Sequence, residues 1–200
     1  MALHKKVKEK AESYWSRTKK MIFLLSVWGV VFSLATIAKL GVGFGYDSTL
    51  VCSTLAYQKA LDQGVAPYSY DFWSTVNKSY DLERPKIVPT AIAWIFRAFG
   101  FRISIITSRP SVDSEGLKKD WRHLVNPNRF VFAENKDTAI QYLEDGNFIL
   151  FFGGSDTEIE DAKKAHVYAL RILQSPECLY KPEDYHPGQF GELKVPLSQY

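Results

Sequence analysis

Three short polar segments of this chain contain residue types that can do chemistry, and each directly follows an apolar run. They are GYDST at 45–49, TSRP at 107–110 and GGSDTE at 153–158. Asp47 and Thr49 in the first segment are types that cap turns and helix starts, and we expect this role rather than catalysis for both. The four histidines are scattered without the spacing of metal ligands, so they predict no metal site.

The second segment allows two interpretations, and the sequence leaves both open. Thr107 and Arg109 could hold an anion at a helix N-terminus, where backbone N–H groups favour negative charge. Arg109 could instead form an ion pair with Asp156 or Glu158 of the third segment.

The elements that position these segments alternate between strand and helix. Five apolar runs are too continuous for half-exposed strands and predict buried parallel strands at 40–46, 103–107, 129–132, 148–152 and 167–173. Helical patterns lie between them at 89–99, 114–124, 136–144 and 157–165. The alternation predicts an α/β fold with a doubly wound, Rossmann-type parallel sheet, whose ligand crevice lies at the carboxyl ends of the strands.

Residues 50–86 interrupt this alternation between the first two strands. The stretch is rich in Tyr, Ser, Asp and Asn, and it predicts a small cap inserted into the fold.

The three polar segments, together with the closing segment LYKPEDYHPGQFGELKVPLSQY, carry a family resemblance. From Val42 to Tyr200 the chain resembles the class B nonspecific acid phosphatases of the haloacid dehalogenase (HAD) superfamily. That family has DxDDT, TGRS and GDSDxD after its first, second and fourth strands, and a lysine before a Q-aromatic-L helix. The resemblance implies a HAD-like fold and a specific reaction. One aspartate attacks phosphorus, a second protonates the leaving alcohol, a threonine and a lysine bind phosphoryl oxygens, and carboxylates hold Mg²⁺.

Set against this pattern, the chain lacks the residues that execute the reaction. The nucleophile falls on Gly45, the phosphate-binding lysine on Ala139 and a metal-binding aspartate on Gly154. Lys136 is out of register with the lost lysine. Ser48, Ser108 and Glu158 are further departures, whereas Asp47, Thr49, Thr107, Arg109 and Asp156 match the family. The resemblance therefore predicts a degenerate site without catalysis and without a cofactor, because glycine offers neither a nucleophile nor a ligand for Mg²⁺.

The first 38 residues differ in composition from the rest. Residues 1–20 hold seven Lys or Arg and two Glu, and residues 21–38 contain no charge. A helix over 21–38 would measure about 27 Å, close to the hydrocarbon thickness of a bilayer. We therefore expect a basic cytoplasmic helical segment at 1–20, a single transmembrane helix at 21–38 and the HAD-like domain at 39–200. The positive-inside rule places the N-terminus in the cytoplasm and the domain outside, in the periplasm if the cell is bacterial.

Two other interpretations of residues 21–38 stay open, a cleaved signal peptide and a buried helix of a soluble domain. If the segment spans a bilayer, Gly29, Ser33 and Thr36 lie on roughly one face and would let a neighbouring helix approach closely. The basic residues before it would contact anionic lipid headgroups.

Composition excludes several classes of protein. The chain has 200 residues, of which 46% are hydrophobic and 24% charged, so it is neither disordered nor of low complexity. Its net charge of +3 comes from residues 1–20, because the other 180 residues hold 18 basic and 20 acidic side chains. Nucleic acid is therefore not an expected partner. Cys52 and Cys178 are the only cysteines, so they form at most one disulfide.

Taken together, the residues and the resemblance predict an inactive, membrane-anchored protein that serves as an accessory or structural subunit of a membrane protein complex. Its partners would be subunits of that complex and the lipid bilayer, and a homo-oligomer is possible. A binding module for an anionic or phosphorylated small molecule at Thr107 and Arg109, and a weak residual phosphatase, are the alternatives. The resemblance also places Cys178 near the end of the first strand, so an oxidising compartment could join it to Cys52.

Overall fold

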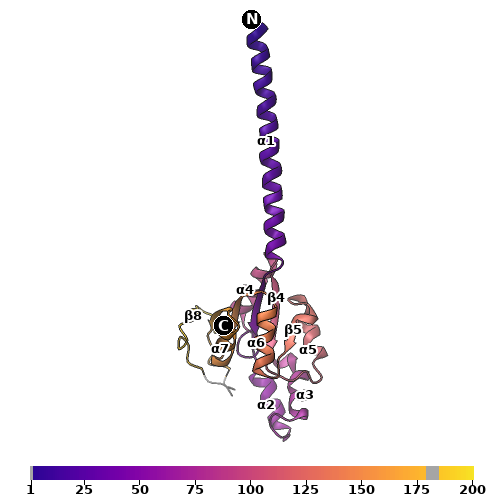
Figure 1. The fold of residues 1–200 in the computed structure, drawn as a ribbon. Helices are drawn as coiled ribbons and strands as arrows, with labels where there is room; N and C mark the ends of the chain where they lie inside the picture. The colour runs from indigo at the N-terminus through magenta and orange to yellow at the C-terminus, as the bar shows by residue number, and fades with distance from the viewer. Residues whose placement is uncertain (1, 179–184) are drawn as a thin grey trace. The chain divides into compact units, whose positions relative to one another are not determined.

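The computed structural model describes residues 2–178 and 185–200 of the chain (Figure 1). The chain divides into two compact units, Met1–Ala38 and Lys39–Tyr200. Helix α1 (Ala2–Ile37) makes up the first unit, and Gly29, Ser33 and Thr36 are exposed on it. Among the helices in the described part of the chain, none is long and apolar enough to cross a membrane, so the expected transmembrane helix at 21–38 is not confirmed.

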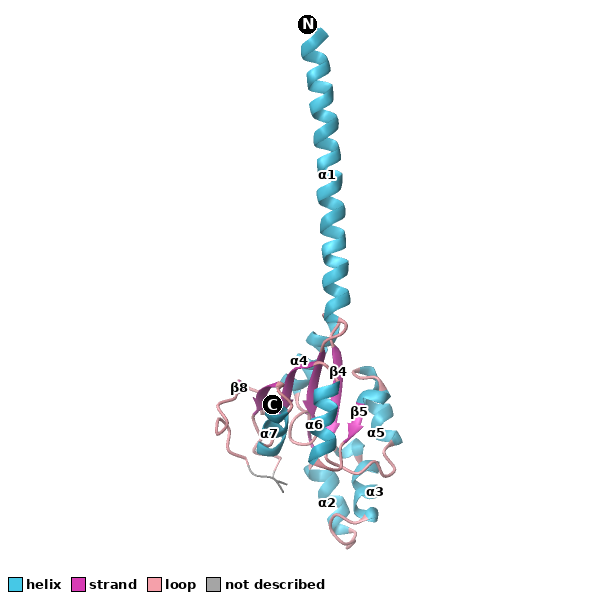
Figure 2. Cartoon of the chain, in the orientation of Figure 1, coloured by secondary structure: helices cyan, strands magenta, loops and turns pink. Residues whose placement is uncertain are grey.

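The second unit is built on a six-stranded parallel sheet in the order β5-β4-β1-β6-β7-β8 (Figure 2). The strands are β1 (Gly41–Gly45), β4 (Arg102–Thr107), β5 (Phe130–Phe132), β6 (Phe148–Gly153), β7 (Tyr168–Ile172) and β8 (Leu193–Val195). The chain leaves β1 toward β4 and β5 on one side and returns to β6 and β7 on the other. The predicted α/β, doubly wound parallel sheet is confirmed, and the order of strands reverses at β1, where such sheets bind ligands.

Helices cover both faces of the sheet. Helices α4 (Ile87–Ala98) and α5 (Glu115–Asp120) pack on the face that holds the side chains of Val42 and Phe44. Helices α6 (Lys136–Asp145) and α7 (Asp156–Lys164) pack on the other face. The four helices lie where the sequence pattern predicts helices, because each pattern repeats its apolar residues at helical spacing toward one of these two cores.

The insertion after β1 contains two helices, α2 (Thr54–Asp62) and α3 (Tyr70–Lys78). They pack on each other through Ala56, Tyr57, Ala60, Phe72 and Val76. The short antiparallel strands β2 (Val51–Cys52) and β3 (Arg84–Pro85) close the insertion at its base. The cap predicted for residues 50–86 is therefore a helical pair on a two-stranded base, and Figure 2 shows it beyond one end of the parallel sheet.

The sixth strand, β8, is the one element of the sheet that the sequence pattern did not predict. It pairs with β7 from Leu170↔Leu193 to Ile172↔Val195. Two of its three residues are exposed, and the strand lacks the apolar run that marks a buried strand. Its pairing depends on β7 offering a free edge, which no local pattern around Leu193 encodes.

Candidate functional site

A cavity of about 430 Å³ lies at the carboxyl ends of β1, β4 and β6, beneath the cap. Thr107 lines it from the end of β4, Asp47 and Ser155 line it from the loops that follow β1 and β6, and Tyr57 and Trp73 line it from the cap. The expected crevice at the reversal of strand order is thus present, and the three polar segments meet there.

Gly45, the predicted nucleophile position, ends β1 directly beside the side chain of Glu158. A Cβ atom on Gly45 would lie 2.0 Å from Oε1 of Glu158, closer than any nonbonded contact allows. The carboxylate of Glu158 therefore takes up the space into which an aspartate at position 45 would project.

The side chain of Glu158 is held in this position by three donors. Its Oε2 accepts hydrogen bonds from the hydroxyl of Thr49 at 3.2 Å and from the backbone N–H groups of Gly154 at 2.7 Å and Ser155 at 3.2 Å. The hydroxyl of Ser155 in turn accepts from the backbone N–H of Glu158, which completes a capping box at the start of α7. The carboxylate of Glu158 thus caps the start of α7 and also blocks the end of β1.

Gly154, the expected metal-ligand position, is also enclosed. A Cβ atom there would lie 2.8 Å from Oγ1 of Thr49 and 2.9 Å from the backbone oxygen of Ser48. Since the second neighbour is backbone, an aspartate at this position requires the loop at Ser48 to move.

Asp47 lines the cavity and forms an ion pair with Arg109. The Nη2 and Nε atoms of Arg109 donate to its two oxygens at 2.6 and 3.0 Å. The hydroxyls of Ser53 and Thr107 also donate to Asp47, at 2.7 and 3.2 Å. The expectation that Asp47 and Thr49 cap the next helix is wrong, because α2 begins after Ser53 and both side chains bind other side chains instead of its first backbone N–H groups.

A second carboxylate, that of Glu83, also binds Arg109. The distance from Nη2 of Arg109 to Oε1 of Glu83 is 2.5 Å, and the guanidinium is fully buried. Tyr46 donates its hydroxyl to Glu83 and accepts from the indole N–H of Trp121. Burial opposes the charge of Arg109, but Asp47 and Glu83 outweigh it and hold the pKa of Arg109 well above its usual range.

These contacts correct the two expectations for Arg109. Its carboxylate partners are Asp47 and Glu83, not Asp156 or Glu158. The guanidinium has no solvent exposure and is not among the residues that line the cavity, so an anion in the cavity does not reach it. Thr107 does line the cavity, and Thr107 and Arg109 therefore do not present a shared anion site.

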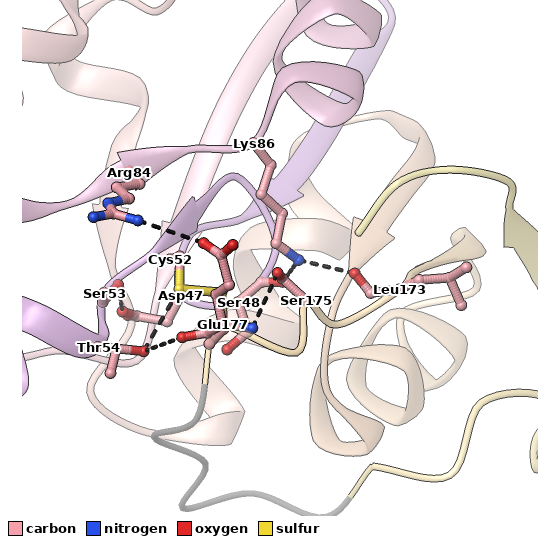
Figure 3. Close-up of a disulfide and its surroundings, with 11 residues drawn as sticks. Asp47, Ser48, Cys52, Ser53, Thr54, Arg84, Lys86, Leu173, Ser175 and Glu177 are labelled. Carbon is pink, nitrogen blue, oxygen red and sulfur yellow. Dashed lines mark hydrogen bonds and ion pairs between the residues drawn. A yellow bond between two sulfur atoms is a disulfide. The ribbon is translucent and has the colours of Figure 1, made fainter. Parts of the chain in front are cut away.

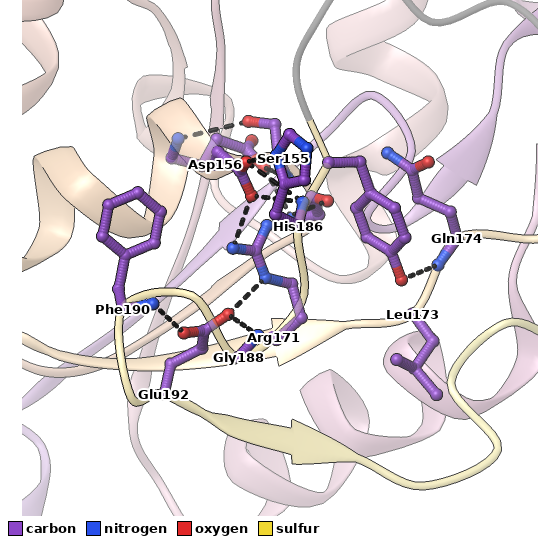
Figure 4. Close-up of polar contacts among 12 residues, drawn as sticks. Ser155, Asp156, Arg171, Leu173, Gln174, His186, Gly188, Phe190 and Glu192 are labelled. Carbon is purple, nitrogen blue, oxygen red and sulfur yellow. Dashed lines mark hydrogen bonds and ion pairs between the residues drawn. The ribbon is translucent and has the colours of Figure 1, made fainter.

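Asp156, the retained acidic residue of the third segment, holds the C-terminal segment onto the sheet (Figure 4). It accepts from Nη2 of Arg171 at 2.8 Å and from the backbone N–H and ring of His186. Glu192 binds the same buried guanidinium through Nε at 2.8 Å. Burial opposes ionisation of Asp156, but the hydrogen bonds from His186 and the charge of Arg171 lower its pKa overall.

A disulfide between Cys52 and Cys178 joins the C-terminal segment to the base of the cap (Figure 3). The two Cα atoms are 5.3 Å apart, within the range that a disulfide needs. Beside it, the ammonium of Lys86 donates to the backbone oxygens of Ser48 at 2.6 Å and Leu173 at 2.9 Å. Residues from both ends of the domain are thus tied together at the cavity.

The positions expected to bind phosphate and metal have little to offer either ligand. Ala139 and Ser108 line the cavity without charge, and Lys136 lines it from the first turn of α6. In the described ranges, no group of three or more His, Cys, Asp or Glu side chains is placed to hold a metal ion. The carboxylate that lies against Gly45 is already bound by three hydrogen-bond donors.

Two features of the site were missed from the sequence. The S-x-x-E pattern of Ser155 and Glu158 is a signal for a capping box and was available. Glu83 had no such signal, because it lies at the end of the cap insertion and meets Arg109 only through the tertiary fold.

Comparison with known proteins finds class B acid phosphatases among the relatives of this chain. No protein-family model matches the chain. The class B acid phosphatase of Edwardsiella ictaluri is 31% identical over 194 residues, which cover 90% of this chain and 80% of that protein. The class B acid phosphatase of Salmonella typhi is 28% identical, with coverage of 98% and 84%. Among solved structures, CbbY from Rhodobacter sphaeroides in complex with phosphate has a TM-score of 0.54 at 11% identity, covering 77% of this chain and 92% of that one.

Proposed function

Because the chain belongs to the class B acid phosphatase family of the HAD superfamily, we propose that it keeps the fold without the reaction. It acts as an accessory or structural subunit of a membrane protein complex, anchored through residues 21–38. The observation that carries the loss of catalysis is the Glu158 carboxylate lying where a side chain of residue 45 would project.

The chemistry of the family explains why this substitution matters. Phosphoryl transfer depends on positioned charge, namely a carboxylate nucleophile, a cationic phosphate clamp and metal ions. Here Gly45 has no nucleophile, Ala139 has no ammonium and Gly154 has no metal-binding oxygen on a side chain. The remaining Asp47 is bound to Arg109 and lacks this electrostatic support. We therefore propose that the Mg²⁺ site is lost and that no other cofactor replaces it.

The purified full-length chain is expected to hydrolyse no p-nitrophenyl phosphate above buffer with Mg²⁺ present. Release of nitrophenolate is the measurement, and an Asp47→Asn variant is the control for contaminating phosphatases. Turnover that disappears in this variant would show that the chain itself is a phosphatase, and the proposal would be wrong.

The proposed anchor rests on charge and length in the sequence. The uncharged segment 21–38 follows a segment with seven basic residues, and only Lys39 follows it closely. This pattern supports an N-terminus in the cytoplasm and a domain outside the cell membrane, in the periplasm if the cell is bacterial. The disulfide between Cys52 and Cys178 supports the same location, since disulfides persist in oxidising compartments.

The proposed partners are subunits of the complex, with the bilayer around the helix and further copies of this chain as an additional possibility. Gly29 has nothing within 4 Å of a Cβ position in this structure, so a second helix has room to approach there. Ser33 and Thr36 lie one and two turns further along the helix and are exposed.

Mild detergent extraction from native membranes, followed by sizing and mass spectrometry, is expected to give a complex larger than one chain. A variant without residues 1–38 should stay folded and lose the complex, because confinement to the bilayer raises the effective concentration of partners. Gly29→Leu should weaken the association, whereas Val30→Leu, at an exposed neighbour, should not. A full-length chain extracted as a lone monomer would contradict the accessory role.

A further inference from the structure

The cavity beneath the cap has a charge that does not suit a phosphate. Four acidic side chains line it, those of Asp47, Glu134, Glu158 and Asp161, and Lys136 is the basic one among the described residues that do. Arg109 lies behind Asp47 and is already bound by two carboxylates. An anion entering here would meet more carboxylates than cations, which repel it.

Asp161 is the member of this set that has a buried oxygen without a hydrogen-bond partner among the described residues. It lines the cavity from α7, is 6% exposed, and its Oδ1 has no hydrogen-bond partner in the described part of the chain. Ala139, on the neighbouring helix α6, lines the same cavity and presents a methyl group where lysine was expected. A buried carboxylate oxygen without a hydrogen-bond partner is uncommon in folded proteins, and a donor that binds beside it satisfies it.

The cap provides the opposite wall, and this wall is aromatic. Tyr57, Tyr68 and Trp73 line the cavity, and the ring centroids of Tyr57 and Tyr68 each lie 5.9 Å from that of Trp73. Ring faces attract cations and also pack against an apolar body. The cavity therefore combines carboxylates on the sheet side with an aromatic surface on the cap side.

We propose that this cavity binds an organic cation, a protonated amine or guanidinium group carried on an apolar or aromatic body. The charged end lies toward Asp161 and the other carboxylates, and the body packs on Tyr57, Tyr68 and Trp73. A free amine and the lysine or arginine side chain of a partner protein share this chemistry. The inference does not depend on the accessory role, since binding is measured on the isolated chain.

The test compares probes of similar shape and opposite charge on the full-length chain in detergent. Phenethylamine is expected to bind about tenfold more tightly than 3-phenylpropionate in calorimetric titration, and inorganic phosphate should not displace it. N-acetyl-lysine amide distinguishes the sources. If it binds at least as well as phenethylamine, the ligand is a protein side chain, and if it binds more weakly, the ligand is a free amine.

Variants of the lining carboxylates assign the binding to this cavity. Asp161→Asn is expected to weaken phenethylamine binding about fivefold or more, without lowering the melting temperature, because Oδ1 of Asp161 makes no hydrogen bond in the described part of the chain. Glu134→Gln, at an exposed lining residue, should weaken it less and cannot disturb the core. Glu160→Gln is the matched control on α7, where Glu160 pairs with Lys164 on the surface, and should leave binding unchanged.

Three results would overturn the proposal. The first is tighter binding of 3-phenylpropionate or phosphate than of phenethylamine. The second is no detectable binding of either amine at millimolar concentration. The third is an affinity for phenethylamine that is unchanged in both Asp161→Asn and Glu134→Gln. Tight phosphate binding in an inactive chain would favour the anion-binding alternative and would leave the loss of catalysis intact.

Discussion

Arg109→Met is expected to lower the free energy of unfolding by about 3–5 kcal/mol, because it leaves two carboxylates without their cation. Arg109 is fully buried and binds Asp47 at 2.6 Å and Glu83 at 2.5 Å. The side chain of Glu83 is 2% exposed, so water cannot take over from the guanidinium. Urea denaturation followed by tryptophan fluorescence measures the loss.

Arg84→Met is the matched control for this prediction. Arg84 pairs with Glu177 at 3.4 Å, and both side chains are more than two-thirds exposed, at 70% and 76%. Water screens such a pair, so its loss should cost about 0–1 kcal/mol. Adding Glu83→Gln to Arg109→Met should recover part of the stability, since it removes one of the stranded charges. Equal losses of unfolding free energy in Arg109→Met and Arg84→Met would contradict this prediction. They would show that the buried ion pairs of Arg109 stabilise the domain no more than an exposed pair does.

Gly45→Asp is expected to destabilise the chain by about 1–3 kcal/mol or more and to give no phosphatase activity. The new Cβ would lie 2.0 Å from Oε1 of Glu158, so the side chain of Glu158 must leave its three donors. The substitution also brings a second carboxylate next to the first, and like charges at this distance repel. Denaturation midpoints and p-nitrophenyl phosphate hydrolysis are the two measurements.

The loss of stability in Gly45→Asp has two causes, the steric clash with Glu158 and the repulsion between the two carboxylates. A shorter side chain at position 158 separates them. Glu158→Asp withdraws the carboxylate from Gly45, so Gly45→Asp with Glu158→Asp should be more stable than Gly45→Asp alone. Activity should stay absent in this pair, because Ala139 and Gly154 still provide no phosphate clamp and no metal ligand. Glu158→Asp by itself is the control for damage to the capping box. Hydrolysis by Gly45→Asp alone would contradict the proposed loss of the metal site.

Adding Gly154→Asp to these substitutions meets a steric obstacle from the backbone, which no change of side chain removes. The backbone oxygen of Ser48 lies 2.9 Å from the Cβ position, and Lys86 holds that same oxygen at 2.6 Å. The loop after β1 has therefore closed around the glycine. We expect that regaining the reaction requires movement of this loop in addition to the lost side chains.

The sequence alone determined the elements of the domain and the places where polar side chains gather. Buried strands show themselves as continuous apolar runs, so β1, β4, β5, β6 and β7 lie where these runs predict them. Helices α4, α5, α6 and α7 follow from helical spacing of apolar residues with Pro, Gly and capping residues near their ends. These signals are local, so each element carries its own, and the carboxyl ends of parallel strands then bring the polar segments to one edge.

Only the tertiary structure decided which of those polar groups bind one another. The pairing of Arg109 with Glu83 joins residues 26 positions apart, on either side of α4 and β4, and the contact of Glu158 with Gly45 spans more than half of the domain. Partner choice depends on side-chain directions and on the space left by neighbours, and neither leaves a pattern in adjacent residues. The absence of an aspartate at position 45 is visible in the sequence. That a carboxylate from α7 occupies this space follows from packing, since Gly45 at the end of β1 leaves a volume that Glu158 can reach from the first turn of α7.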